Sequence, residues 1–309
     1  MANFLVLIPS FTAIISAMQS LPLVLSVFLM GLLPLPSLPP QSAPTLAALP
    51  LASPPLPATQ EFPGKRLATA VSASGVVILD LQSGQELFAR RGDTRRSVGS
   101  LTKMMTAILI AENHSMDEVV TIPNGIDKTD GSSMHLPAGS HFTVGDLLSA
   151  LLIPSANDAA ETLARFHSGS RDAFVAAMNE RTKMLGLRNT SFANPSGLDD
   201  TSQWSTPRDM AWLASYALRN AEIRSRMSTA SAVMYSREGE KFLLENTNAM
   251  LRKGSSVIAG KTGTTVAAKQ CLFSLVTENG REYIVVLLGS RERYTDMRAV
   301  LRVLSTLFA

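Results

Sequence analysis

The spacing of apolar residues along this chain changes from strand-like to helical and then back to strand-like. That order limits the folds available to the chain. Strand-like patterns near the start cover 67–71, 75–81 and 86–89. Strand-like patterns return at 257–265, 270–277 and 282–288. Asn279-Gly280, before the last of these, is a strong signal for a two-residue hairpin. Strands at both ends with helices between them predict an α+β fold, in which an antiparallel sheet is flanked by helices and carries a mostly helical insertion.

The helical patterns between the two groups of strands have clear start signals. They cover 101–112, 144–153, 158–166, 173–185 and 207–218, and one more follows at 295–307. Thr143 and Asp146 form a capping-box pattern before the second of these. Thr206 precedes Pro207 as an expected N-cap, with the proline at the first helical position. A short strand is also expected at 119–122.

The amino-terminal sixty residues have a different composition from the rest. No Asp, Glu, Lys or Arg precedes Glu61, and twelve of the seventeen prolines lie in the first 63 residues. Residues 1–35 are mostly apolar and are interpreted as a signal peptide or an N-terminal membrane anchor, although the usual basic residues are missing. Residues 36–64 are interpreted as a proline-rich linker and residues 65–309 as one folded domain. We therefore expect export, with the domain in the periplasm or at the outer face of the cytoplasmic membrane.

Charge and cysteine content narrow the function classes. The net charge is only +3 and no dense run of Lys or Arg occurs, so nucleic acid is not an expected partner. The single cysteine, Cys271, excludes an intrachain disulfide and lies in an apolar run typical of a buried strand. The four histidines share no metal-ligand or catalytic spacing, so neither a metal nor a cofactor is expected.

Ser100 and Lys103 stand at the start of the first helical pattern, three residues apart. Residues at that spacing are neighbours on a helix surface. A serine nucleophile needs an adjacent base, and a lysine held among apolar side chains loses its proton more readily. The pair alone is a weak pattern, because a serine N-cap followed by an exposed lysine is more common.

Two further motifs make the pattern specific. Ser155-Ala156-Asn157 falls on a loop between two helical patterns, and Lys261-Thr262-Gly263-Thr264 falls in a strand. The glycine permits close backbone approach by a ligand, while the lysine and threonine suit the binding of a carboxylate. An ordered set of Ser-x-x-Lys, Ser-x-Asn and Lys-Thr-Gly motifs is a known signature of serine acyl-transfer enzymes that react with penicillin.

At these motifs the chain resembles the low-molecular-mass penicillin-binding proteins, the serine D-alanyl-D-alanine carboxypeptidase and endopeptidase family. Other family-like segments, in the family's order, are GSSMHL, LLIPSANDAAETLA, MNERTKMLGLRNTSFANPSGLD, STPRDMA and NTNAML. The resemblance runs from about residue 67 to the end of the chain. It implies a β-lactamase/penicillin-binding-protein-like fold, with residues 65–309 as the catalytic domain of a serine D,D-peptidase. The implied partners are peptidoglycan stem peptides ending in D-Ala-D-Ala, and β-lactams as covalent inhibitors.

The resemblance also implies a role for each motif residue. Ser100 would be the nucleophile and Lys103 the general base, while Ser155 would relay a proton to the leaving amine beside Lys261 and Asn157 would orient Lys103. Lys261, Thr262, Gly263 and Thr264 would bind the substrate, with the backbone N–H groups of Ser100 and Thr264 as the oxyanion hole. Arg291 or Arg293 would assist in binding the terminal carboxylate.

Three departures and three alternatives accompany this hypothesis. Ala156 replaces a more common glycine, Lys269-Gln270 replaces a more common Gly-Tyr, and the chain stops after the closing helix, so any membrane attachment is expected at the amino-terminal end. The sequence does not separate carboxypeptidase from endopeptidase action. A class A-like β-lactamase is disfavoured because 179–200 lacks the deacylating Glu-x-x-Leu-Asn motif. A non-catalytic wall-binding protein is disfavoured because every motif residue is intact.

Overall fold

A computed structural model of the protein describes residues 62–126, 129–251 and 254–306. The expected signal or anchor segment at 1–35, almost all of the expected linker at 36–64, and residue 307 of the closing helix lie outside these described residues. Within the described ranges, no helix is both long enough and apolar enough to cross a lipid bilayer.

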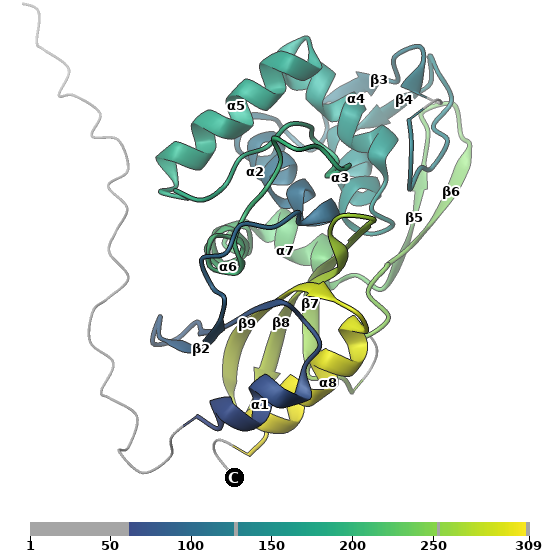
Figure 1. The fold of residues 1–309 in the computed structure, drawn as a ribbon. Coiled ribbons are helices and arrows are strands. Elements are labelled where there is room, and N and C mark those ends of the chain that lie inside the picture. Colours follow the sequence, from purple (N-terminus) through teal and green to yellow (C-terminus); the bar gives the residue numbers. More distant parts are fainter. Residues whose placement is uncertain (1–61, 127–128, 252–253, 307–309) are drawn as a thin grey trace, which may run out of the picture. The chain divides into compact units, whose positions relative to one another are not determined.

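A five-stranded antiparallel sheet forms one layer of the described domain (Figure 1). Its order is β2-β1-β9-β8-β7. The bounds are β1 Gly75–Asp80, β2 Glu86–Arg90, β7 Val257–Thr265, β8 Lys269–Glu278 and β9 Arg281–Ser290. The hairpin between β8 and β9 turns at Asn279 and Gly280, which both have positive φ angles of 50° and 74°. The predicted sheet is confirmed, and strands from the two ends of the chain meet where β1 pairs with β9.

The strand predicted at 67–71 is wrong, because most of these residues belong to a helix. α1 spans Gly64–Ala70 and lies next to α8, Arg293–Leu304 (Figure 1). Leu67 is completely buried in the apolar cluster between this pair of helices and the sheet. Leu67 and Val71 are four residues apart, a spacing that fits one helix face as well as it fits one strand face, so the short pattern was ambiguous.

The helices of the insertion lie on the other side of the sheet, where the last two of them make the main contacts with its strands and the others pack against those helices and one another (Figure 1). Their bounds are α2 Lys103–Asn113, α3 Val144–Leu152, α4 Asn157–Ser168, α5 Arg171–Met184, α6 Pro207–Ala217 and α7 Ala221–Ser228. Both predicted starts are confirmed: Thr143 and Asp146 form a capping box on α3, and Thr206 caps α6 with Pro207 in its first turn. The sequence interpretation missed α7 and the two-stranded pair of β5, Ser231–Tyr235, with β6, Lys241–Glu245. A second short pair joins β3, Val119–Thr121, to β4, His141–Thr143.

A short 3₁₀ turn, η2, spans Gly99–Thr102 and leads directly into α2. Every residue of α2 from Lys103 to Ile110 is buried, so the helix runs through the interior of the domain. Because η2 also packs against β7, the start of this buried helix meets the edge strand of the sheet. The Ser-x-x-Lys motif therefore lies at the junction of the sheet and the helical insertion.

Candidate active site

The structure brings Ser100 and Lys103 into contact at the start of α2. The Nζ atom of Lys103 lies 3.2 Å from the Oγ atom of Ser100. The side chain of Lys103 has no exposed surface, whereas Ser100 lines an open cleft. The alternative of an exposed lysine behind a serine N-cap is wrong, because the lysine is buried and Ser100 makes no side-chain cap.

Lys103 has two further hydrogen-bond acceptors. Its Nζ donates to Oδ1 of Asn157 at 2.5 Å and to the carbonyl oxygen of Ser196 at 2.6 Å. A neutral amine has two N–H groups and one lone pair. With the two N–H groups donated to Asn157 and Ser196, the lone pair faces the Ser100 hydroxyl, which is the arrangement that a general base requires.

The surroundings of Lys103 favour its neutral form. Burial of the ammonium group lowers the pKa of Lys103 well below its ordinary value, and the nearby cation of Lys261 lowers that pKa further. The carboxylates of Glu161 and Asp158 act in the opposite direction and raise it. The lysine is thus able to act as a base at a pH where an exposed lysine holds its proton.

Ser155 and Lys261 form a second pair across the cleft. The Nζ atom of Lys261 donates to Oγ of Ser155 at 2.6 Å and to the carbonyl oxygen of Thr262 at 3.0 Å. Burial, followed by the charge of Arg293, lowers the pKa of Lys261 to about 7. Ser155 has a positive φ angle of 68°, an uncommon conformation for a serine that turns its side chain toward the lysine.

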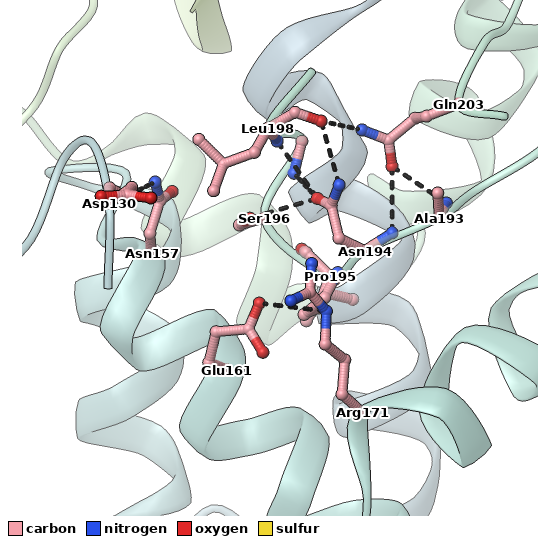
Figure 2. A network of polar contacts seen from close by, with 12 residues as sticks. Asp130, Asn157, Glu161, Arg171, Ala193, Asn194, Pro195, Ser196, Leu198 and Gln203 are labelled. Atoms are coloured by element: carbon pink, nitrogen blue, oxygen red, sulfur yellow. Dashed lines mark hydrogen bonds and ion pairs between the residues drawn. The ribbon is translucent and has the colours of Figure 1, made fainter. Parts of the chain in front are cut away.

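Asn157 is held at both its backbone and its side chain. Its backbone N–H donates to the carbonyl oxygen of Ser132, and its Nδ2 donates to that of Asp130, both at 2.7 Å (Figure 2). The amide orientation is fixed by these contacts, so Oδ1 faces Lys103. The 129–140 segment therefore supports the second motif from outside.

Residues 194–198, here called the Asn194 loop, place the Ser196 carbonyl against Lys103. Oδ1 of Asn194 accepts the backbone N–H groups of Gly197 and Leu198, and Oε1 of Gln203 accepts those of Ala193 and Asn194 (Figure 2). Both amide side chains are almost fully buried. The loop is therefore folded by buried amide groups rather than by regular secondary structure.

Three glycines permit the Asn194 loop, η2 and β7 to approach one another at the nucleophile. Gly197 has a φ angle of +92°, and a Cβ atom at this position would lie 2.1 Å from the carbonyl oxygen of Gly99. A Cβ atom on Gly263 would lie 3.0 Å from the backbone N of Ser100, and one on Gly99 would lie 3.2 Å from that of Thr264. The backbone nitrogens of Ser100 and Thr264, predicted as the oxyanion hole, thus belong to two segments in close contact.

The cleft contains Arg293 but not Arg291. It is lined by residues that include Ser100, Ser155, Thr262, Thr264, Gln270 and Arg293. The Arg293 guanidinium donates to the carbonyl oxygens of Gly263 and Cys271 and to the hydroxyl of Thr264. Arg291 is exposed and is not among the residues that line this cleft. Of the two arginine candidates, the structure places only Arg293 beside the Lys-Thr-Gly motif.

Several residues of the site were missed in the sequence. One of them is Ser196, whose backbone carbonyl oxygen accepts a hydrogen bond from Lys103. A backbone contact of this kind cannot be recognised from residue types. Thr247 is another, because its hydroxyl lies 2.5 Å from that of Thr262 in the cleft. Gln270, which the sequence shows only as a departure from the family pattern, accepts from both the backbone N–H and Nε of Arg293. Cys271 is buried in β8 as predicted, and burial raises the pKa of its thiol to about 11.

Comparisons with known proteins agree with this geometry. Residues 61–292 match the Peptidase S11 family, D-alanyl-D-alanine carboxypeptidase. The chain is 34% identical over 233 residues to D-alanyl-D-alanine carboxypeptidase DacF of Bacillus subtilis, a match that covers 74% of this chain and 60% of the relative. It is 35% identical over 237 residues to the D-alanyl-D-alanine carboxypeptidase of Streptomyces sp. strain K15, covering 71% of this chain and 81% of that one. A D-alanyl-D-alanine endopeptidase of Pseudomonas aeruginosa is 30% identical over 239 residues, covering 75% and 76%.

A solved structure supports the fold assignment. The crystal structure of the Streptomyces K15 DD-transpeptidase matches with a TM-score of 0.72 and 30% identity, covering 77% of this chain and 97% of that chain. The predicted penicillin-binding-protein-like α+β fold is therefore confirmed. The chain spans only 60% of the length of the Bacillus relative, so the activity of that whole protein does not transfer by similarity alone.

Proposed function

Because this chain belongs to the Peptidase S11 family of D-alanyl-D-alanine carboxypeptidases, we propose that it is a serine D-Ala-D-Ala carboxypeptidase that acts on peptidoglycan stem peptides. The observation that carries this proposal is the buried Lys103, whose Nζ lies 3.2 Å from the Ser100 hydroxyl while two acceptors hold its remaining hydrogens. That geometry supplies an activated nucleophile without a histidine or a metal ion.

Acylation begins when Oγ of Ser100 attacks the carbonyl carbon of the penultimate D-alanine. The Oγ–C bond forms while the hydroxyl proton passes to Nζ of Lys103. The oxygen of the tetrahedral intermediate carries the negative charge, which the N–H groups of Ser100 and Thr264 stabilise. The C–N bond then breaks, and the departing D-alanine nitrogen takes a proton from the Ser155 hydroxyl, which Lys261 replaces through its 2.6 Å contact.

Deacylation uses the same groups with water as the nucleophile. Before this step Lys103 releases the Ser100 proton to solvent and Lys261 regains a proton from solvent, which restores both to their starting states. Neutral Lys103 then accepts a proton from the attacking water, the new O–C bond forms, and the ester bond to Ser100 breaks. The Ser100 oxygen regains a proton from Lys103, and the shortened peptide releases the second water proton to solvent and leaves as a carboxylate. One base therefore serves both half-reactions.

The terminal carboxylate of the substrate is expected beside the Lys-Thr-Gly motif. The hydroxyls of Thr262 and Thr264 line the cleft there, and Arg293 and Lys261 provide positive charge. Positive charge with hydroxyl donors is suited to a free carboxylate and selects a peptide that ends at this point. Arg293 replaces Arg291 as the arginine that we assign to this interaction.

Muropeptide digestion tests the proposal. The wild-type protein should convert pentapeptide-bearing muropeptides into tetrapeptide products with release of free D-alanine, as followed by mass spectrometry. Ser100→Ala should produce none, and Arg291→Gln should retain the activity because that side chain lies outside the cleft. Equal release by wild type and Ser100→Ala would overturn the proposal.

Endopeptidase action is a second candidate, supported by the similarity to the Pseudomonas D-alanyl-D-alanine endopeptidase. Both reactions form the same acyl-enzyme and differ only in the leaving amine. The same digestion separates them, because an endopeptidase converts cross-linked dimers into monomers. Absence of both reactions, with no penicillin adduct, would instead favour a non-catalytic wall-binding protein, and rapid turnover of a chromogenic cephalosporin would favour a β-lactamase.

We also propose that the protein works outside the cytoplasm, where peptidoglycan lies. The apolar, charge-free residues 1–35 support export by cleavage or by retention as an anchor. Cell fractionation with an epitope tag at the carboxyl end is the test: the protein should be found in the periplasm or at the outer face of the cytoplasmic membrane, and a mainly cytoplasmic pool would contradict the proposal.

A further inference from the structure

Glu161 is a buried acid that none of the three motifs contains. It lies on α4 one helical turn after Asn157, so the two side chains project from the same side of that helix. Its side chain is only 8% exposed. Fully charged carboxylates are rarely buried to this degree unless a partner compensates them. The position of Glu161 therefore calls for a physical reason.

The ion pair of Glu161 compensates its charge only in part. Nε of Arg171, at the start of α5, lies 3.7 Å from Oε1 of Glu161, and Arg171 itself is 47% exposed (Figure 2). This separation is too long for a strong charge-assisted hydrogen bond. The carboxylate is thus only partly neutralised from the outside of the domain.

Glu161 is connected to the base through the helix that carries both Glu161 and Asn157. Asn157, one turn earlier on α4, accepts the hydrogen bond of Lys103, and α2 packs against α4 there. The charges that act on this group are Lys103 on α2, Asp158 and Arg165 on α4, and Arg171 on α5. Asp158 is occupied by the Ser133 hydroxyl and by the backbone N–H groups of Met134 and Leu136, so Glu161 is the carboxylate in this group without backbone donors among the described contacts.

We propose that Glu161 is a positioning residue of the acyl-transfer site, whose buried carboxylate, one helical turn from Asn157 on α4, acts through space on the Lys103 amine that Asn157 holds. The inference rests on the proposed function of Ser100 and Lys103. In this arrangement Lys261 pushes Lys103 toward the neutral base, and Glu161 pulls it toward the ammonium form. The balance between the two sets the lowest pH at which Ser100 is activated.

The sign of the effect follows from the charges. A negative group near Lys103 raises the pKa of that lysine, and burial of Glu161 raises its own pKa, with Arg171 opposing. Removal of the negative charge lowers the pKa of Lys103. More of the lysine is then neutral at acid pH, so the acid limb of the acylation rate moves to lower pH.

The test is the pH profile of the acylation rate with a labelled penicillin. Glu161→Gln keeps the shape of the side chain and removes the charge. We expect its acid limb to lie at lower pH than that of the wild type, with an acylation rate several-fold higher on the acid side of the profile. Glu161→Asp restores a carboxylate and should return the limb toward the wild-type position.

Two controls separate this electrostatic role from a structural one. Glu180→Gln on α5 removes an acid that is 64% exposed and paired with Lys183, and it should leave the profile unchanged. The Glu161→Gln shift should persist at high salt, because interactions between buried charges are screened much less than those at a surface.

The outcomes distinguish this inference from the proposed function. If the wild type is acylated at Ser100 and Glu161→Gln is folded but has an unmoved acid limb, the inference is wrong and the function stands. A uniform loss of rate at all pH values, with a lower melting temperature and no shift, assigns Glu161 a structural role and also overturns the inference. Absence of acylation in the wild type would overturn the proposed function itself.

Discussion

Lys103 has to be neutral to accept the Ser100 proton, and the groups around it decide how readily it becomes so. Its amine is buried, lies near the cation of Lys261 and donates to the neutral Oδ1 of Asn157. Replacing that neutral acceptor by a charged one is the smallest change that should favour the protonated form of Lys103 over the neutral form. It alters one atom and adds one negative charge.

Asn157→Asp is therefore expected to stabilise the Lys103 ammonium. The negative charge raises the pKa of the lysine, so less neutral base is present at a given pH and the acid limb of the acylation rate moves to higher pH. At a pH below the limb the rate should fall about tenfold for each unit by which the limb moves. Stopped-flow acylation by a fluorescent penicillin gives this profile, and a limb that moves to lower pH would contradict the assigned role of Lys103.

The residues that act through side chains were accessible from the sequence, and those that act through the backbone were not. The three motifs pointed to Ser100, Lys103, Ser155, Asn157 and Lys261, and the structure brings these five together. The Ser196 carbonyl escaped notice because any residue carries a carbonyl. Glu161 also escaped, because a helical pattern does not say that an acid four residues after Asn157 is buried.

Gly197 allows the Asn194 loop to pack closely against the turn that carries the nucleophile. A Cβ atom at this position would overlap the carbonyl of Gly99, next to the nucleophile, and its φ angle of +92° disfavours other residues. Gly239 provides a matched control, because its φ angle is +93° and nothing lies within 4 Å of its Cβ position.

We expect Gly239→Ala to lower the free energy of unfolding by about 1 kcal/mol, the typical cost of an unfavourable backbone angle. Gly197→Ala should cost about 3 kcal/mol or more, because overlap adds to the angle, and it should also slow acylation by displacing η2. Urea unfolding and acylation rates measure both effects. Equal costs at the two positions would show that the close approach does not matter.

At the scale of elements, prediction succeeded where local signals were redundant. The β8–β9 hairpin had a two-residue turn signal as well as strand periodicity, and α3 and α6 had caps as well as helical periodicity. α1 had only a short apolar pattern, and the β5–β6 pair has exposed apolar residues such as Val233 and Leu243 that obscure its alternation. Tertiary packing, rather than local preference, determined those elements.

The packing of α1 on the sheet gives a prediction of its own. Leu67 is completely buried, so Leu67→Ala should lower the free energy of unfolding by about 2–5 kcal/mol. An alanine at the neighbouring exposed position, Arg66→Ala, should change it by less than about 0.5 kcal/mol. Chemical denaturation provides the comparison, and similar small effects at both positions would argue that α1 does not pack on the sheet.

At the scale of the whole molecule, the buried Lys261 of the active site is expected to lower the free energy of unfolding. Burial lowers the pKa of Lys261 from the ordinary 10.5 to about 7, so the unfolded chain binds this proton more tightly than the folded one. Below about pH 7 both states are protonated and the folded state bears the full cost of a buried cation. As pH rises from about 7 to 10.5, the folded state is neutral while the unfolded state still holds its proton, so this cost declines and is absent above 10.5.

Lys261→Met should therefore raise the melting temperature while abolishing most activity. The increase should be largest at or below pH 7 and should shrink toward pH 10, because the methionine removes a cost that exists only while the unfolded lysine is charged. Lys183→Met, which removes an exposed lysine on α5, is the control and should show little pH dependence. Differential scanning calorimetry across pH makes the comparison, and an increase that grows with pH would contradict the linkage.

The central claim is that Ser100, activated by Lys103, forms a covalent acyl-enzyme. The most direct measurement is intact-protein mass spectrometry after incubation with a penicillin, followed by peptide mapping of the adduct. The account predicts one added penicillin per chain, located on Ser100, and no adduct in Ser100→Ala. An adduct that survives in Ser100→Ala, or that maps to another residue, would contradict the account.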